Sequence, residues 1–179
     1  MHLLQWKNLT LINMGLKKIG LLIITVLTLI GCGAYSFTGT NTTAETIQID
    51  FFPNNAPLVE PQLTQRFTND LQDLFVRQTN LNLVPSNGEL YLSGEITGYR
   101  ITPMSGTSNQ TAAQNRLTVT VNVRFVNKEN EKDDFEKTFS FYSDFAANAQ
   151  LTGGVLETAL DEIIERITQD IFNASVAKW

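Results

Sequence analysis

The sequence predicts an α+β fold, a two-layer sandwich in which two helices cover one face of a four-stranded mixed or antiparallel sheet. Two observations support this prediction. Four segments alternate apolar and polar residues with the period of a strand, and two longer segments repeat apolar residues with the period of a helix. The elements follow in the order β-α-β-β-β-α. Because each strand is apolar on one face only, that face needs cover, which two amphipathic helices can supply.

The first strand is expected at residues 46–51, because apolar and polar residues alternate there until Pro53. A helix is expected next, from Pro61 to about Thr79, since proline suits the first position of a helix. A helix in this place can cross over and bring the first strand parallel to a later one. The apolar residues of the strand are Ile47, Ile49 and Phe51, and those of the helix are Leu63, Phe67, Leu71, Leu74 and Phe75.

Three further strands are expected to form an antiparallel meander. They lie at residues 89–101, 117–125 and 134–145, and a charged hairpin at 127–133 joins the last two. Two glycines in the first of these strands, Gly94 and Gly98, predict a bulge or a bend.

The last helix is expected from Val155 to about Lys178, with Thr152 as its cap. Its apolar face consists of Leu156, Leu160, Ile163, Ile164, Ile167 and Ile171. With both helices on one side, the other face of the sheet is expected to be polar and aromatic, and either solvated or used for binding. That face should carry Tyr91, Tyr99, Thr118, Thr120, Arg124, Thr138, Ser140 and Tyr142.

A bacterial lipoprotein signal peptide is predicted near the start of the chain. Two lysines precede a short apolar run, residues 19–30, which leads to Cys32, the only cysteine in the sequence. The run is shorter than the roughly twenty residues that a membrane-spanning helix needs. We therefore expect residues 1–31 to be a leader and signal peptide, with translation starting at Met14.

Processing would leave a mature chain that begins at Cys32, with a diacylglycerol thioether on its sulfur and an acyl group on its amino terminus. Residues 32–45 are expected to be a lipidated tether and residues 46–179 a single domain; no other cofactor is expected. The leader removes three lysines and no acidic residue, so the formal net charge falls from −5 to −8. Such an acidic protein is a poor partner for nucleic acid or an anionic membrane surface, so the lipid must attach it to the membrane.

The residues that follow the cysteine, 33–36, contain no acidic side chain. In some bacteria an aspartate there retains a lipoprotein at the inner membrane, and in others an acidic cluster directs it to the cell surface. Because neither signal is present, we expect the protein at the periplasmic face of the outer membrane.

Catalytic and metal-binding classes lack the residues they need. The only histidine, His2, leaves with the leader, so histidine bases, free thiol nucleophiles and Cys/His zinc sites are excluded from the mature chain. The acidic cluster at 129–134 lacks the spaced ligands and the glycine of an EF-hand loop, and we interpret it as a solvated hairpin turn. We expect no enzyme, no catalytic residue and no metal.

Several segments follow the lipoprotein motif in a fixed order: YSFTG at 35–39, LYLSGEITGY at 90–99, NRLTV at 115–119 and DIFN at 170–173. This order resembles the LPS-assembly lipoprotein family, LptE, in its Bacteroidetes form, over essentially the whole mature chain. The resemblance implies a partner, the LptD β-barrel, inside which the protein acts as plug and assembly factor. It also implies support for lipopolysaccharide transport and insertion in the outer leaflet.

The resemblance further implies basic contacts to lipopolysaccharide, whose phosphates suit the fork of an arginine. Arg100, Arg116 and Arg124 are the only basic residues on the central strands and are the candidates. The alternative is that these arginines are solvated or structurally paired.

The connection at 102–115 contains no charged residue and is unusually long for a hairpin. It is either a mobile hairpin tip or a probe that reaches into the barrel lumen or towards substrate. On the second interpretation, deleting residues 107–110 would impair the complex more than folding, and normal lipopolysaccharide export by the deletion variant would contradict it. Trp179 either packs on the core or contacts the partner.

A second hypothesis remains open, a generic lipoprotein that faces the periplasm and binds another envelope partner through the same sandwich. The ordered family-like segments favour the assembly factor, because a generic binding protein has no reason to carry them.

Overall fold

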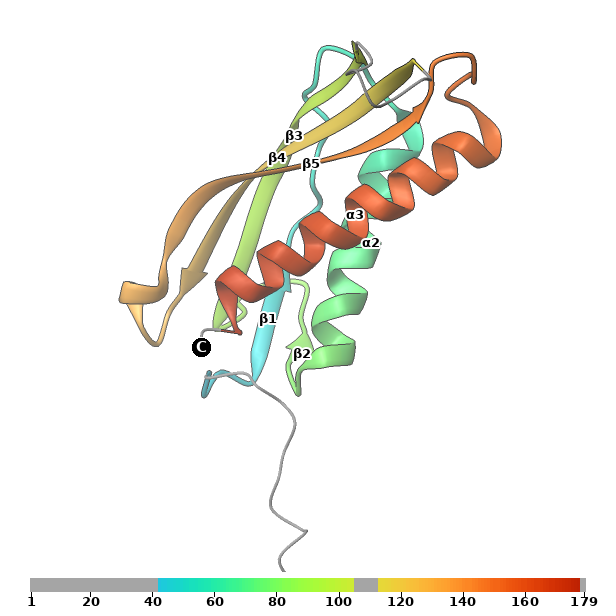
Figure 1. Ribbon diagram of the computed structural model, residues 1–179. Coiled ribbons are helices and arrows are strands. Elements are labelled where there is room, and N and C mark those ends of the chain that lie inside the picture. The colour runs from blue at the N-terminus through green and yellow to red at the C-terminus, as the bar shows by residue number, and fades with distance from the viewer. Residues whose placement is uncertain (1–41, 105–112, 178–179) are drawn as a thin grey trace, which may run out of the picture. The chain divides into compact units, whose positions relative to one another are not determined.

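The computed structural model describes residues 42–104 and 113–177, and over these residues it contains a five-stranded sheet with two helices on one face (Figure 1). The elements are β1 (Thr46–Ile49), α2 (Pro61–Gln78), β2 (Asn82–Leu83), β3 (Leu90–Met104), β4 (Gln114–Asn127), the 3₁₀ turn η2 (Glu131–Asp133), β5 (Phe135–Ala146) and α3 (Gly153–Ser175). The predicted α+β class, mixed sheet and two helices are confirmed. The predicted number of four strands is wrong.

The strands are ordered β2-β1-β3-β4-β5. β1 pairs in parallel with β2 and β3, and β3, β4 and β5 form the expected antiparallel meander. The strand that sequence analysis misses is β2, whose two residues are both exposed. Backbone hydrogen bonds hold this segment, from Asn82 N to Glu45 O at 2.9 Å and from Val84 N to Ile47 O at 2.9 Å. A strand of two residues has no periodicity that a sequence could display.

The first strand was predicted to bury every second residue up to Phe51, but β1 ends at Ile49 and the alternation ends with it. Phe51 is 56% exposed, whereas Phe52 is fully buried and takes the core position. The Phe52 ring meets Phe67 of α2 edge to face at 5.2 Å. The backbone N–H of Phe52 also donates to the hydroxyl of Thr68 at 3.2 Å, which fixes this segment against the helix.

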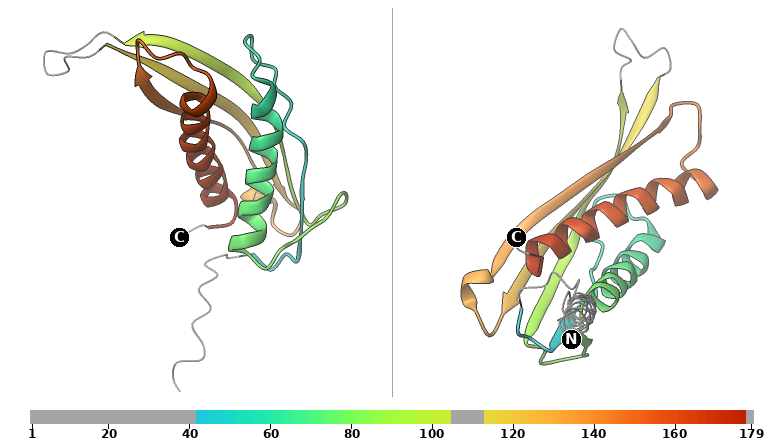
Figure 2. Two further views of the ribbon diagram at one scale, coloured as in Figure 1. Left: turned by 90° about the vertical axis from the view of Figure 1, so that its right-hand side faces the viewer. Right: turned by 60° about the horizontal axis from the view of Figure 1, so that its bottom comes forward.

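Helix α2 begins at Pro61, as predicted, and its cap is Glu60, whose side chain accepts a hydrogen bond from Gln62 N at 3.4 Å. All five predicted apolar residues of α2 are buried. Figure 2 shows α2 and α3 on the same side of the sheet. The two helices meet where Phe75 packs edge to face on Phe172 at 5.1 Å.

Helix α3 begins and ends a few residues before its predicted bounds. Five of the six residues predicted for its apolar face are buried, and Leu156 is half-buried. Thr152 occupies the cap position, but its side chain makes no capping hydrogen bond. An ion pair between Arg66 of α2 and Asp161 of α3 joins the outer surfaces of the two helices.

The predicted irregularity in β3 is a β-bulge. The register with β4 shifts between Ile96 and Gly98, which leaves Thr97 as the extra residue. An extra residue reverses which side chains face the helices, so Tyr99 lies opposite Val119 on the covered face and is 7% exposed. The prediction that Tyr99 lies on the open face is therefore wrong.

Several predictions concern residues outside the described ranges. These are the leader with its start at Met14, lipidation at Cys32, most of the tether, the segment 107–110 and Trp179. The described ends of the connection differ from expectation, because residues 102–104 belong to β3 and residues 114–115 belong to β4.

Candidate functional site

Strands β3 and β4 extend past the helices at one end of the sheet, and the end of β5 runs beside them next to α3 (Figure 2). We call this region the sheet tip: residues 100–104, 114–118 and 142–146. Up to Tyr99, buried residues recur along β3, but residues 100–103 are exposed on both of its faces. The tip therefore offers side chains from three adjacent strands to solvent or to a partner.

Arg116 of β4 lies directly opposite Asp144 of β5 on the open face of the tip. Its Nε donates to Asp144 Oδ1 at 2.7 Å and its Nη2 donates to Oδ2 at 2.7 Å, the bidentate geometry that gives strong, directional pairing. The guanidinium also lies over the ring of Tyr142, 3.5 Å from the ring centroid. Hydrogen bonding from Arg116 lowers the pKa of Asp144, and hydrogen bonding to Asp144 raises the pKa of Arg116. The anion-binding fork of Arg116 is thus already occupied by a carboxylate.

Arg100 of β3 is exposed, and it makes no ion pair or hydrogen bond with any residue of the described ranges. It lies opposite Thr118, while Thr102, two residues further along β3, lies opposite Arg116. Arg100 and Arg116 are therefore diagonal neighbours on the open face, a relationship that places residues about 7–8 Å apart. Arg100 is the guanidinium of this pair that remains open to an external anion.

Arg124 lies away from the tip. It is eight residues from Arg116 along β4, about 26 Å at the rise of an extended strand, and it faces Ser93 and Glu136 on the neighbouring strands. Near it the hydroxyl of Tyr91 donates to Asp50 Oδ2 at 2.6 Å, and this bond raises the pKa of Tyr91. The structure brings Arg100 and Arg116 together and leaves Arg124 elsewhere.

The sequence pattern gives no indication of the role of Asp144 or of the contact between Tyr142 and Arg116. Both follow from the register of β4 and β5, because each places a residue opposite or beside Arg116. The pairing of Arg116 with Asp144 could be predicted only if the geometry of the hairpin turn were known, because the turn sets the register of β4 and β5.

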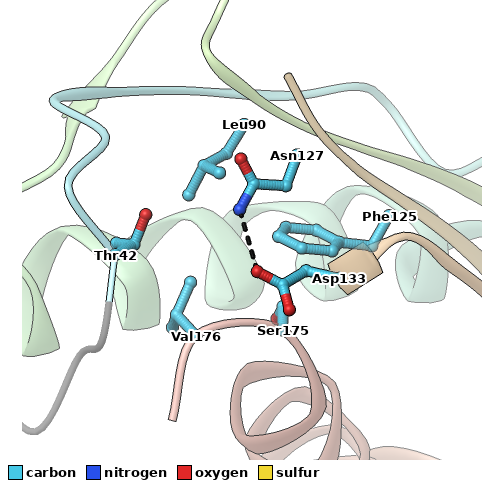
Figure 3. Close-up of a pocket in the computed structure, with 7 residues that line it drawn as sticks. All are labelled: Thr42, Leu90, Phe125, Asn127, Asp133, Ser175 and Val176. Carbon is cyan, nitrogen blue, oxygen red and sulfur yellow. Dashed lines mark hydrogen bonds between the residues drawn. The ribbon is translucent and has the colours of Figure 1, made fainter. Parts of the chain in front are cut away.

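The opposite end of the sheet contains a small cavity between β3, β4 and the end of α3 (Figure 3). Its volume is about 20 Å³, and the Nδ2 of Asn127 donates across it to Asp133 Oδ2 at 3.2 Å. A polar cavity of this size has room for about one water molecule and for no larger ligand. Thr42, the first described residue, lines it, so the described chain starts at the end of the sheet that is far from the tip.

The carboxylate of Glu89 fixes the segment that leads into β1. It accepts hydrogen bonds from Glu45 N at 2.5 Å and from Thr46 N at 3.1 Å, and these two bonds lower the pKa of Glu89. The N–H of Glu89 in turn donates to the hydroxyl of Thr46 at 3.1 Å. Residues 45–46 are thereby held beside the start of β3, about 46 Å from its end at Met104 if β3 is fully extended.

Two features of membrane proteins and metalloproteins are not found within residues 42–104 and 113–177. No group of three or more Cys, His, Asp or Glu side chains is arranged to hold a metal ion. No helix of these residues is long and apolar enough to cross a bilayer. What the described part does contain is a two-layer α+β domain with one covered and one open sheet face, and the open face carries paired and unpaired arginines at its tip.

Comparison with known families identifies this domain. The model of the LptE lipopolysaccharide-assembly family matches residues 44–175, which include every helix and strand described above. The chain belongs to the LptE family, and its role lies in lipopolysaccharide assembly. No curated protein matches the sequence.

Solved structures of similar shape include a hypothetical protein from Chlamydia trachomatis, with a TM-score of 0.52 and 8% identity over 75% of this chain and 99% of that one. A minor lipoprotein from Acinetobacter baumannii has a TM-score of 0.41 and 15% identity over 77% of this chain and 100% of that one. Rare lipoprotein B from Shewanella oneidensis has a TM-score of 0.40 and 12% identity over 72% of this chain and 90% of that one. At such low identity the first of these supports the fold alone.

Proposed function

We propose that this protein is an outer-membrane lipoprotein that associates with an LptD-type β-barrel as plug and assembly factor, and so supports lipopolysaccharide transport and insertion in the outer leaflet. The observation that carries the proposal is the LptE family match over residues 44–175. The expected non-enzymatic role agrees with that family.

The open face of the sheet suits a position inside a barrel. Its side chains are mainly hydroxyls, amides and charged groups, and the lumen of a large outer-membrane barrel is polar. The length also fits, since β3 is about 46 Å from end to end if fully extended and the apolar band of such barrels is about 25 Å tall. A plug anchored near Thr42 can therefore extend its tip through the full depth of the membrane.

The anchor in this proposal is lipid on Cys32, at the periplasmic face of the outer membrane. Two or three acyl chains hold a protein on a bilayer without a basic patch, which an acidic chain does not offer. Confinement to the membrane plane raises the effective concentration of the plug near an embedded barrel. The hydrogen bonds from Glu45 and Thr46 to Glu89 then fix the position at which the tether leaves the domain.

Direct contact with lipopolysaccharide falls mainly to Arg100 in this proposal. Its guanidinium is exposed and has no internal partner among the described residues. Arg116 stands beside it but is engaged by Asp144, so it contributes only when that carboxylate is displaced or neutralised. Arg124 is separated from both and would contact a different part of the ligand or the barrel wall.

Affinity purification of the tagged full chain from membranes in mild detergent tests the association. Recovery of a stoichiometric LptD-type barrel supports the proposal. Its absence, with another envelope protein in its place, would favour a generic lipoprotein instead. Mass spectrometry of the same sample tests the anchor, because the mature chain must begin at Cys32 and carry fatty acid.

A further inference from the structure

Among the described residues, the sheet ends at β5, a strand of twelve residues whose one pairing partner there is β4. The far side of an end strand carries backbone N–H and C=O groups without a ladder partner, and another extended chain can pair with them. Natural proteins block such edges with inward-pointing charges, proline or bulges. The question is therefore which part of β5 is blocked and which part is open.

In the first half of β5, Lys137 hinders pairing with a further strand. This charged residue lies opposite Val123, on the face that the helices cover, and its Nζ is 5.0 Å from the centroid of the Phe139 ring. A strand added beside it would have to desolvate this ammonium group. The second half, residues 140–146, has no charged residue on the covered face, which there carries Phe141, Ser143 and Phe145.

A hollow lies directly beside this second half of β5. It has a volume of about 290 Å³ and is bounded by Phe141 of β5 and by one flank of α3, at Glu162, Glu165, Arg166 and Gln169. Phe141 is only half-buried, although Phe139 and Phe145 on the same face of the strand are buried. The ring of Phe141 thus presents apolar surface to a space that a side chain of a neighbouring strand would enter.

The charges around the hollow define what fits. Glu162 accepts a hydrogen bond from Ser143 at 2.6 Å, and Glu165 makes no ion pair or side-chain hydrogen bond within the described part of the chain. The one cation among the residues that line the hollow is Arg166, which is paired with Asp170 at 3.5 Å and has its guanidinium 5.7 Å from the centroid of the Phe141 ring. The hollow therefore combines an apolar floor with an excess of carboxylate, and it favours an occupant that is apolar and basic.

We infer that residues 140–146 of β5 accept an extended segment of a partner protein as a further strand. On the face that points into the hollow, this segment carries an apolar residue against Phe141 and a Lys or Arg two positions away, which pairs with Glu162 or Glu165. A second copy of this chain does not fit, because antiparallel pairing of two β5 edges would bring the carboxylates of both α3 helices together. This surface shares residues 142–146 with the sheet tip, but it uses the backbone edge and the helix-covered face of β5, whereas Arg100 and Arg116 lie on the open face. The inference holds whichever envelope protein supplies the segment.

A short peptide that alternates as Thr-Lys-Thr-Val-Thr-Lys-Thr, blocked at both ends, is the probe. It is added at millimolar concentration to the full chain in detergent, and amide hydrogen exchange is followed by mass spectrometry. The expected result is exchange slowed about tenfold or more within residues 140–146, because backbone amides on the open edge gain hydrogen bonds. The same peptide with N-methyl groups along one edge keeps its charges but should give no protection.

Two matched variants separate strand addition at the hollow from general attraction to an acidic protein. Glu165→Lys should weaken peptide binding about tenfold, whereas Glu157→Lys, the same charge change at an exposed site of α3 outside the hollow, should leave it nearly unchanged. Equal loss in both variants, protection by a peptide with Glu in place of Lys, or protection at β2 instead of β5 would each overturn the inference. Failure to recover an LptD-type barrel would leave these results unaffected, so the two proposals fail independently.

Discussion

The Arg116 side chain of β4 donates two hydrogen bonds of 2.7 Å to Asp144 of β5. The guanidinium of Arg116 also lies over the ring of Tyr142. This arrangement holds the arginine in one orientation on the open face and neutralises its charge locally. Arg100, on the adjacent strand, has no such partner within the described residues. Arg100 is therefore available to bind an external anion, whereas Arg116 must first release Asp144.

Replacing Asp144 with Asn should release the fork of Arg116 and strengthen binding of lipid A phosphates several-fold, because the competing carboxylate is lost. Arg100→Ala should weaken binding by a similar factor in the natural background, whereas Arg116→Ala should have a smaller effect. Binding of purified lipopolysaccharide to the full chain in detergent, measured by calorimetry at low ionic strength, checks this order. The control is Arg124→Ala, and an effect of Arg124→Ala larger than that of Arg100→Ala would place the ligand away from the tip.

Neighbouring phenylalanines offer a test of the core. Phe52→Ala removes a fully buried ring that packs on Phe67, and it should destabilise the fold by about 3–5 kcal/mol. Phe51→Ala changes a ring that is largely in solvent and should alter the free energy of unfolding by less than about 0.5 kcal/mol. Denaturant unfolding of both variants measures the difference. Similar losses in the two would contradict the assignment of Phe52, rather than Phe51, to the core.

Acid should loosen the segment that Glu89 holds. Its pKa is lowered from the ordinary value of 4.5 by the N–H groups of Glu45 and Thr46, so the ionised carboxylate is the form that the folded state favours. The stabilisation is fully present above that ordinary value and is lost as the pH falls through the lowered pKa of the folded state. The amide NMR signals of Glu45 and Thr46 should move together in this acidic range. In Glu89→Gln they should resemble the acid form already at pH 7, and an unchanged titration in that variant would refute the assignment.

Much of the architecture could be predicted because its determinants are periodic. The apolar spacing of α2 and α3 and the alternation in β4 extend over many residues, so each pattern outweighs local exceptions. Gly94 and Gly98 also predicted the irregularity in β3 correctly. Arg116 and Arg124 lie on the open face as the alternation in β4 predicts, whereas Arg100 shares the parity of Leu90 and Leu92 and reaches that face only because of the bulge at Thr97.

The remaining features depend on contacts between distant residues. The bulge at Thr97 reverses the orientation of Tyr99, but no local pattern says which residue of β3 is the extra one. β2 forms because the carbonyls of Glu45 and Ile47 accept hydrogen bonds from Asn82 and Val84, and two residues are too few to show a strand pattern in the sequence. The pairing of Arg116 with Asp144 requires the register of β4 and β5, which the hairpin turn sets.

Two glycines should respond in opposite directions to the same small change. A Cβ added at Gly94 would lie 2.2 Å from the backbone oxygen of Asn122 and 2.6 Å from Cε1 of Phe52. Because the backbone of β4 cannot move aside without breaking the sheet, Gly94→Ala should destabilise the protein by about 1–3 kcal/mol. A Cβ at Gly154, in the first turn of α3, meets nothing within 4 Å, so Gly154→Ala should stabilise by about 0.4–1 kcal/mol through the unfolded chain. Thermal unfolding of the two variants compares them directly, and a Gly94→Ala protein as stable as the natural one would mean that β3 and β4 pack less closely at this point than described.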